Sequence, residues 1–346
     1  MIWYVILFFI IFLLSFKIPQ KKYNIYDLLT MTILILFSGL RYEVGTDYSL
    51  YKTIYQSNIN GFLDSVTSRT GYGFSMLTHL FGHDLGLDYK FFVFFCSFIT
   101  ITCIYMFIKK YSKKPGLAIL LYVSLGFYTA SFNGFRQQLS LAIALFGYML
   151  FKENKKLFSI IFFFIAFLLH SSSIVPIIIF ILFEILKKEN MNPLCIYIPI
   201  IIFYIFYNTL FYRLLGFIES YSLYTDYVST PGLGTYMMVL VYNIVLIFLI
   251  LPKRKKIFSN NPTMKVFINY VIIGSALMIL QTKNWLFVRL ATDFTIFAPL
   301  LLAEYYVAAN IKEKKLESLL FYAFIFTYYL LYINSFGGII PYKWIF

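Results

Sequence analysis

Charged residues are scarce in this chain of 346 residues: only 13% are Asp, Glu, Lys or Arg, whereas 61% are hydrophobic. Soluble domains carry about 25% charged residues, so a soluble globular fold is excluded. The three cysteines lie in or beside hydrophobic runs without metal-binding spacing. No Walker or dinucleotide-binding glycine motif occurs. The segment before Lys17 lacks the leading charge and the small-residue cleavage site of a signal peptide.

Hydrophobic runs fill most of the chain and predict an all-α polytopic integral membrane protein. We expect one transmembrane domain, 1–346, with about 12 membrane-spanning helices. Their expected ranges are 1–16, 27–40, 91–108, 116–130, 137–151, 157–169, 174–186, 194–211, 236–251, 266–280, 290–309 and 319–334. Several are shorter than the roughly 20 residues of a full span. The runs 157–169 and 174–186 therefore form either two spans or one re-entrant pair.

The basic residues that give the chain its net charge of +14 are placed as the topology of a membrane protein requires. With the N-terminus outside, 20 of the 29 basic residues fall in alternate, inner loops, as the positive-inside rule requires. These residues are Lys17, Lys21, Lys22, Lys109, Lys110, Lys113, Lys114, Lys152, Lys155, Lys156, Lys187, Lys188, Lys253, Arg254, Lys255, Lys256, Lys265, Lys312, Lys314 and Lys315. Because these basic residues form short, separate clusters between apolar runs, they do not form a continuous groove that could bind a polyanion. We therefore expect no nucleic-acid partner.

Two polar segments fall on the outer side in this topology. The first, 41–90, is a long extracytoplasmic loop in which Met76, Leu77, Leu80, Phe81 and Leu85 have helical spacing. This pattern predicts a short amphipathic helix at the membrane interface. The second, 212–235, is a loop rich in tyrosine and glycine that can stack on sugars.

Arginine is the residue that distinguishes the outer side, since it is suited to bidentate contact with phosphate. Five of the six arginines fall there: Arg41, Arg69, Arg136, Arg213 and Arg289. All three histidines do as well. Arg136 and Arg289 each lie in the first turn of an inward-running helix, where the helix dipole disfavours a cation by some tenths of a kcal/mol to about 1 kcal/mol. Two such placements point to an anionic ligand.

Local motifs suggest how an outer anion pocket forms. Asn133 is a suitable N-cap for the helix that carries Arg136 and Gln137. His170 and Ser171 head a third inward-running helix, and Arg41 ends the second span. We expect Arg41, Arg136, His170 and Arg289 to share one pocket that binds an anion. The alternative is that the arginines snorkel to the interface and that the histidine only caps a helix.

Acidic and metal-binding candidates are fewer. Glu43 and Asp47 stand near Arg41 and either pair with it, form a local turn, or act as a base toward a sugar hydroxyl. His79 and His83 are four residues apart with Asp84 beside them, a spacing compatible with a metal, but no further ligand is in view. We therefore expect neither a metal nor another cofactor.

Several motifs occur in an order that resembles a known family. They are Gly39–Tyr48 with Tyr51 and Tyr55, Phe135-Arg136-Gln137-Gln138-Leu139, Leu168-Leu169-His170-Ser171-Ser172, Arg289 before a span ending in Glu304-Tyr305-Tyr306, and the Pro341-Tyr342 tail. Together they resemble the EpsG branch of the Wzy-type polysaccharide polymerases, over most of the chain. The resemblance implies a GT-C-like glycosyltransferase of the bacterial cytoplasmic membrane with an outward-facing active site. It also implies undecaprenyl-diphosphate-linked glycans as donor and acceptor, with membrane lipid and a chain-length regulator as further candidate partners.

The expected function is polymerisation of lipid-linked oligosaccharide repeats into surface polysaccharide such as O-antigen, capsule or exopolysaccharide. We expect Arg136 and Arg289 to hold the donor diphosphate, with Arg41 assisting, and His170 or Asp47 to contact or deprotonate the acceptor hydroxyl. The substrate-binding residues expected beside them are Glu43, Tyr48, Asn133, Gln137 and Ser171. Metal-dependent GT-C enzymes commonly carry an acidic motif in the first outer loop, whereas Glu43 and Asp47 stand beside Arg41, which favours a metal-independent site.

Two other function classes compete with a polymerase. A flippase of lipid-linked oligosaccharide would carry ionisable residues along a path near mid-bilayer, whereas here they gather at one face. A membrane O-acyltransferase would need an intramembrane His-Asp pair, and none is evident.

Overall fold

The structure is a computed structural model that describes residues 1–60, 71–216 and 232–346. In this part of the chain every regular element is a helix, and an isolated antiparallel bridge joins Arg41 and Trp344. The chain divides into two compact units, Met1–Leu182 with Phe321–Phe346, and Phe183–Leu320. The protein is thus an all-α membrane protein, as the composition predicts.

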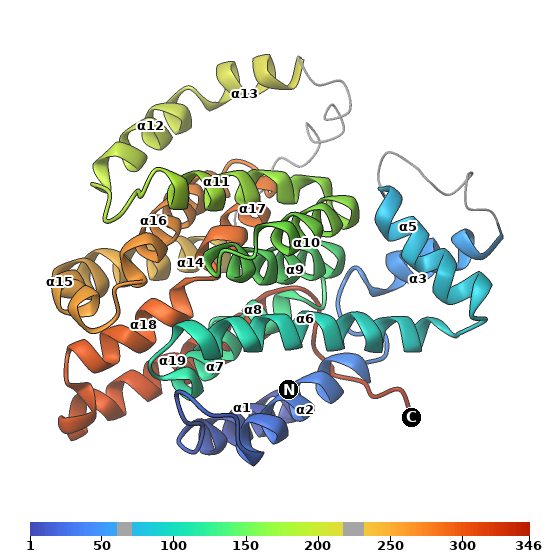
Figure 1. Cartoon of the computed structure of the whole chain (residues 1–346), viewed down its shortest axis with the longest axis horizontal. Helices are drawn as coiled ribbons and strands as arrows, with labels where there is room; N and C mark the ends of the chain where they lie inside the picture. Colours follow the sequence, from blue (N-terminus) through green and yellow to red (C-terminus); the bar gives the residue numbers. More distant parts are fainter. Residues whose placement is uncertain (61–70, 217–231) are drawn as a thin grey trace. The chain divides into compact units, whose positions relative to one another are not determined.

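The first unit contains most of the elements that the candidate residues occupy (Figure 1). Its helices are α1 (Ile2–Ser15), α2 (Ile25–Gly39), α3 (Tyr48–Asn60), α5 (Tyr72–His79), the π-helix η1 (Leu80–Asp84), α6 (Tyr89–Tyr111), α7 (Pro115–Ser124), α8 (Phe127–Ala130), α9 (Phe135–Lys152), α10 (Lys156–Leu169), the 3-10 turn η2 (Ser171–Ser173), and most of α11 (Ile174–Ile185) and of α19 (Lys315–Ser335).

The second unit consists of shorter helices. They are α12 (Leu194–Ile205), α13 (Tyr207–Gly216), α14 (Leu233–Ile244), the π-helix η4 (Val245–Ile250), α15 (Leu251–Asn260), α16 (Met264–Leu280), α17 (Leu286–Thr295), α18 (Ala298–Ala308) and the 3-10 turn η5 (Ile311–Glu313). Helix α16 packs on α17. Asn269 of α16 also fixes the chain before α12, since its amide accepts from Met191 N (2.8 Å) and donates to Lys188 O (2.7 Å).

Each of the twelve predicted spans corresponds to a helix or to a broken helix at the same place in the chain. By length and composition, three helical stretches of the described residues can cross a membrane: Tyr89–Tyr111, Gly234–Asn260 and Lys315–Ser335. Helices α17 and α18, which are bent by 45° at their junction, qualify together as a fourth. Most of the other apolar helices have 10–17 residues. The number of spans beyond these four stays a prediction.

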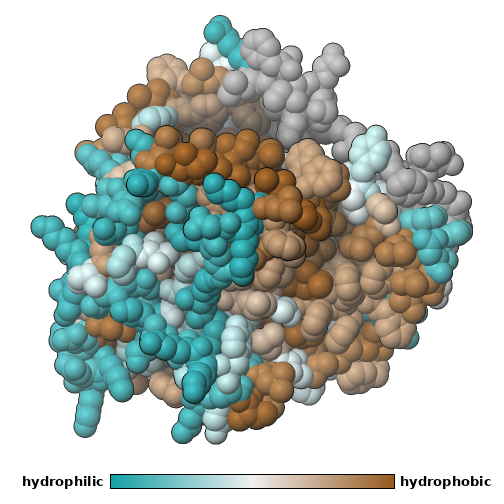
Figure 2. All heavy atoms as spheres, in the orientation of Figure 1, coloured by the Kyte–Doolittle hydropathy of each residue, from teal (hydrophilic) through white to brown (hydrophobic). Residues whose placement is uncertain are grey.

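The outward-facing side chains of the helices are those expected next to lipid. In α10 the exposed residues include Leu157, Phe158, Ile160, Ile161 and Phe164, and hydrophobic side chains cover much of the surface seen in Figure 2. The opposite side of α10 packs along α9, where Ser140 Oγ donates to Ala166 O (2.7 Å). Helix α6 packs on both α2 and α9, and so forms the centre of the first unit.

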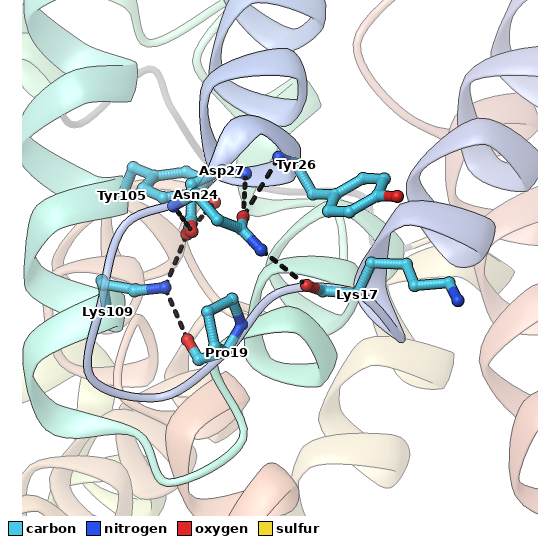
Figure 3. A network of polar contacts seen from close by, with 7 residues as sticks. All are labelled: Lys17, Pro19, Asn24, Tyr26, Asp27, Tyr105 and Lys109. Carbon is cyan, nitrogen blue, oxygen red and sulfur yellow. Dashed lines mark hydrogen bonds and ion pairs between the residues drawn. The ribbon is translucent and has the colours of Figure 1, made fainter.

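A buried ion pair joins α2 to α6 at the end of α6 predicted to face inward (Figure 3). Lys109 Nζ lies 2.7 Å from Asp27 Oδ1, and both side chains are almost fully buried. Tyr105 OH donates to the same oxygen (2.9 Å), while Asn24 and Asp27 form a capping box at the start of α2. Lys109 was predicted only as one of the basic residues that set the membrane topology. It is in fact buried and paired with Asp27 of α2, which lies 82 residues earlier in the sequence.

Candidate functional site

Arg136 occupies the predicted place, the second residue of α9. The N-cap of this helix is Gly134, which has no side chain to satisfy the first amides. The prediction that Asn133 caps α9 is wrong, because the Asn133 side chain is used elsewhere. The positive pole of α9 thus lies beside the half-buried Arg136, a combination suited to an anion.

Asn133 binds the C-terminal tail instead of capping α9. Its Nδ2 donates to Gly337 O (2.9 Å), and its Oδ1 accepts from Thr46 Oγ1 (3.3 Å). Gly337 has a φ of 76°, and a Cβ there would lie 2.0 Å from Asn133 Nδ2. This position therefore requires glycine, both for its backbone conformation and for its close approach to the amide.

The tail continues along the loop that follows α2. Ile345 N donates to Leu40 O (3.0 Å), Tyr42 N donates to Lys343 O (3.0 Å), and Lys343 Nζ lies 3.5 Å from Glu43 Oε2. The sequence indicated this tail only as a Pro-Tyr motif. Its contacts with residues about 300 positions earlier have no local sequence signal, although the Gly337-Gly338 pair marks the turn that permits them.

Arg41 is the most buried charged side chain of this region, with 2% of its surface exposed. Its NH1 donates to the carbonyl and hydroxyl oxygens of Ser38 and to Ser97 Oγ, while its Nε has no hydrogen-bond partner among the described residues. Its Cζ lies 4.8 Å from the ring centroid of Phe132 and 5.4 Å from that of Phe135. Burial lowers the pKa of the Arg41 guanidinium, since a charged group loses its hydration there.

The two acids near Arg41 do not pair with it. Glu43 is exposed, has a φ of 52° and faces Lys343, whereas the half-buried Asp47 accepts from Thr46 Oγ1 (3.3 Å). In the described part of the chain no carboxylate forms an ion pair with Arg41, so its charge is balanced only by neutral dipoles and aromatic rings.

Tyr48 belongs to an aromatic cluster at the start of α3. It is buried, and its ring lies 5.3 Å from that of Tyr89, a contact that packs α3 on α6. Burial raises the pKa of the Tyr48 hydroxyl. The described loop between Arg41 and Tyr48 is therefore held between the tail on one side and α6 on the other.

His170 and Arg136 lie at the same end of the antiparallel pair α9 and α10. The Ser140–Ala166 hydrogen bond fixes the level of the two helices, and Arg136 is one turn before Ser140 while His170 is one turn after Ala166. His170, which is half-buried, ends α10 and precedes the turn η2, whose first residue, Ser171, is exposed.

Helix α5 covers this end of the helix pair. The Cζ of Arg136 lies 5.8 Å from the ring centroid of Phe74, and a Cβ on the neighbouring Gly73 would come 2.7 Å from the backbone of Leu168. The amphipathic stretch predicted between Met76 and Leu85 is thus a helix, formed by α5 and η1. Its location at a membrane interface stays a prediction.

Arg41, Asn133 and Arg136 accordingly lie around the N-terminal end of α9, and His170 lies at the same end of the α9–α10 pair. Gln137, the next residue after Arg136 in α9, is buried. Arg289 is an exposed residue in the first turn of α17 and belongs to the second unit. Arg69 and most of the predicted loop 212–235 lie outside the described residues.

Comparison with known proteins matches the chain to a family model. No curated protein and no solved structure matches the chain. The family model described as "EpsG family" matches residues 24–344, which include every candidate residue. The chain therefore belongs to the EpsG family, a family of Wzy-like polysaccharide polymerases.

Proposed function

We propose that this membrane polymerase joins undecaprenyl-diphosphate-linked oligosaccharide repeats into a surface polysaccharide at the outer face of the bacterial cytoplasmic membrane. The observation that carries the proposal is the buried Arg41 guanidinium beside Phe135, the first residue of α9, with Arg136 in the same helical turn. Arg41 and Arg136 both lie near the N-terminus of α9, and no carboxylate of the described residues pairs with Arg41. A lipid diphosphate supplies the anion that this arrangement favours.

In this proposal the guanidinium of Arg136 contacts the donor diphosphate, and the buried Arg41 contributes its charge from behind Phe132 and Phe135. Arg289, on α17, is assigned to the same diphosphate. The bond from the anomeric carbon to the diphosphate oxygen breaks, and a bond from that carbon to the acceptor hydroxyl oxygen forms. The released diphosphate gains negative charge, so fixed cations stabilise the transition state more than the ground state.

The acceptor hydroxyl must lose a proton in this reaction. His170 and Asp47 are the proposed bases, and both are half-buried rather than enclosed, so both can meet a substrate. Glu43, Tyr48, Asn133, Gln137 and Ser171 are assigned to substrate binding. The contacts of Asn133 with Thr46 and Gly337 give it a further role, since they shape the loop that carries Asp47.

We further propose about 12 membrane spans in a GT-C-like arrangement, with a chain-length regulator as a separate partner. The basic residues at alternate loops support this topology. A flippase is less consistent with the charged groups, because Arg41, Arg136 and His170 lie at one end of α9 and α10 instead of along a path.

The lipid-linked glycans that accumulate in a deletion strain test the proposal. A polymerase defect leaves single repeats displayed on the outer side, where an added glycosidase or lectin reaches them in intact cells. A flippase defect leaves single repeats that become accessible only after the cells are opened, and that result would refute the proposed function.

A further inference from the structure

Two histidines and one aspartate meet at the junction of α5 and η1, outside the candidate site. His79 is the last residue of α5, and His83 and Asp84 are the last two of the π-helix. The imidazole rings are nearly parallel, with centroids 4.5 Å apart. Asp84 Oδ1 lies 2.9 Å from His83 Nδ1 and 3.9 Å from His79 Nε2.

The wider turn of the π-helix explains why one carboxylate reaches both rings. In η1 the backbone bonds span five residues, as in Leu85 N to Leu80 O (3.0 Å), so His83 and Asp84 both turn toward the end of α5. Short π-helical segments frequently occur at functional sites. Neighbouring elements hold this one in place: Leu87 N donates to Phe81 O (2.9 Å), and Tyr55 OH donates to Leu87 O (2.7 Å).

The spacing of the three donors suits one ion. Their ligand atoms all lie within 4.8 Å of one another. An ion with bonds of about 2.1 Å accommodates donor pairs up to about 4.2 Å apart, so a small rotation of the exposed His83 ring completes the set. Two imidazoles and one carboxylate match the preferences of divalent transition metals such as Zn²⁺ rather than those of Mg²⁺ or Ca²⁺.

We propose that His79, His83 and Asp84 form a binding site for a divalent transition-metal ion of the zinc type. The three protein ligands leave at least one coordination position open to water or to an anionic group. The ion links the end of α5 to η1, and α5 is the helix whose Phe74 contacts Arg136. This site is independent of the proposed glycosyl transfer and carries no step of it.

The test uses the full-length protein, purified with a tag that contains no histidine, held in lipid nanodiscs and stripped with EDTA. Titration with Co²⁺, whose visible absorption reports tetrahedral or five-coordinate nitrogen and oxygen ligands, should show one saturable site from which Zn²⁺ displaces the probe. His83→Gln and Asp84→Asn change exposed residues and should each weaken binding on the order of 100-fold.

His170→Gln is the matched control, because it removes the remaining histidine of the chain and should leave Co²⁺ binding unchanged. Each variant is checked for a wild-type melting profile without metal, so that lost binding is separated from lost folding. The inference is overturned if the wild-type protein shows no saturable Co²⁺ site, or if His83→Gln and Asp84→Asn bind as tightly as the wild type. Failure of this test leaves the polymerase proposal untouched, and failure of the deletion-strain test leaves the metal site untouched.

Discussion

Replacement of Arg136 by lysine tests whether this arginine binds a phosphate group or only extends its charge to the membrane interface. The substitution keeps the charge in the first turn of α9 but removes the planar guanidinium that lies over the Phe74 ring and can hold two phosphate oxygens. A charge-assisted hydrogen bond contributes roughly 1.5–3 kcal/mol. Because each 1.36 kcal/mol corresponds to a factor of ten, the loss of one or two such bonds should slow polymerisation about ten-fold to a few hundred-fold.

The assay is the amount and length of surface polymer in cells that express each variant at the same level. Arg289→Lys should give a loss of the same order, whereas Arg213→Lys, an exposed position on α13 outside the proposed site, should give wild-type polymer. A snorkelling arginine would be replaced by lysine without effect, since lysine reaches the interface equally well. Wild-type polymer from both Arg136→Lys and Arg289→Lys would therefore refute the assignment of these residues to the diphosphate.

Three further outcomes test other parts of the structure. Gly337→Ala should destabilise the protein by about 1–3 kcal/mol, because the new Cβ would meet Asn133 and the backbone conformation would be strained. Both the melting temperature and the polymer yield should therefore fall. Gly232→Ala, where a Cβ meets nothing within 4 Å, is the control. Lys109→Met should destabilise the purified protein by about 3–5 kcal/mol, measured as a fall in melting temperature, because it leaves Asp27 buried without its counter-ion; an unchanged melting temperature would contradict the proposed importance of this pair. In a cysteine-free background, an impermeant thiol reagent should label a cysteine at position 83 in intact cells and spare one at position 255, and the reverse pattern would overturn the predicted topology.

The helices were predictable because each depends on local composition. A run of apolar residues between clusters of lysine has few alternatives to a helix in lipid, since its backbone amides must bond within the segment. The start of α9 was predicted one residue too early, because it was based on Asn133 as the N-cap, whereas the N-cap is Gly134. The location of His170 and Arg136 at the same end of α9 and α10 followed from the alternation of the short runs, which makes the two helices antiparallel neighbours.

The detailed contacts of the site were not predictable, because distant segments compete with local rules. Asn133 satisfies the usual requirements of an N-cap, yet its amide meets Gly337, which is 204 residues away. Glu43 stands two residues from Arg41 in sequence, but its backbone conformation turns it toward Lys343. The π-helical turn that brings Asp84 to both histidines likewise has no simple signature in sequence.

Arg41 is the residue that best distinguishes a functional explanation of this region from a structural one. A buried ionic group rarely adds net stability, and a well-packed neutral side chain of similar volume would often serve as well or better. The cost is greater here because Arg41 lies beside Phe135 at the positive pole of α9, which disfavours a cation. Neutral serine oxygens and aromatic rings offset only part of that cost. A buried guanidinium held beside a helix N-terminus is poorly explained by folding alone, but it is well explained by a reaction whose leaving group gains negative charge at that point.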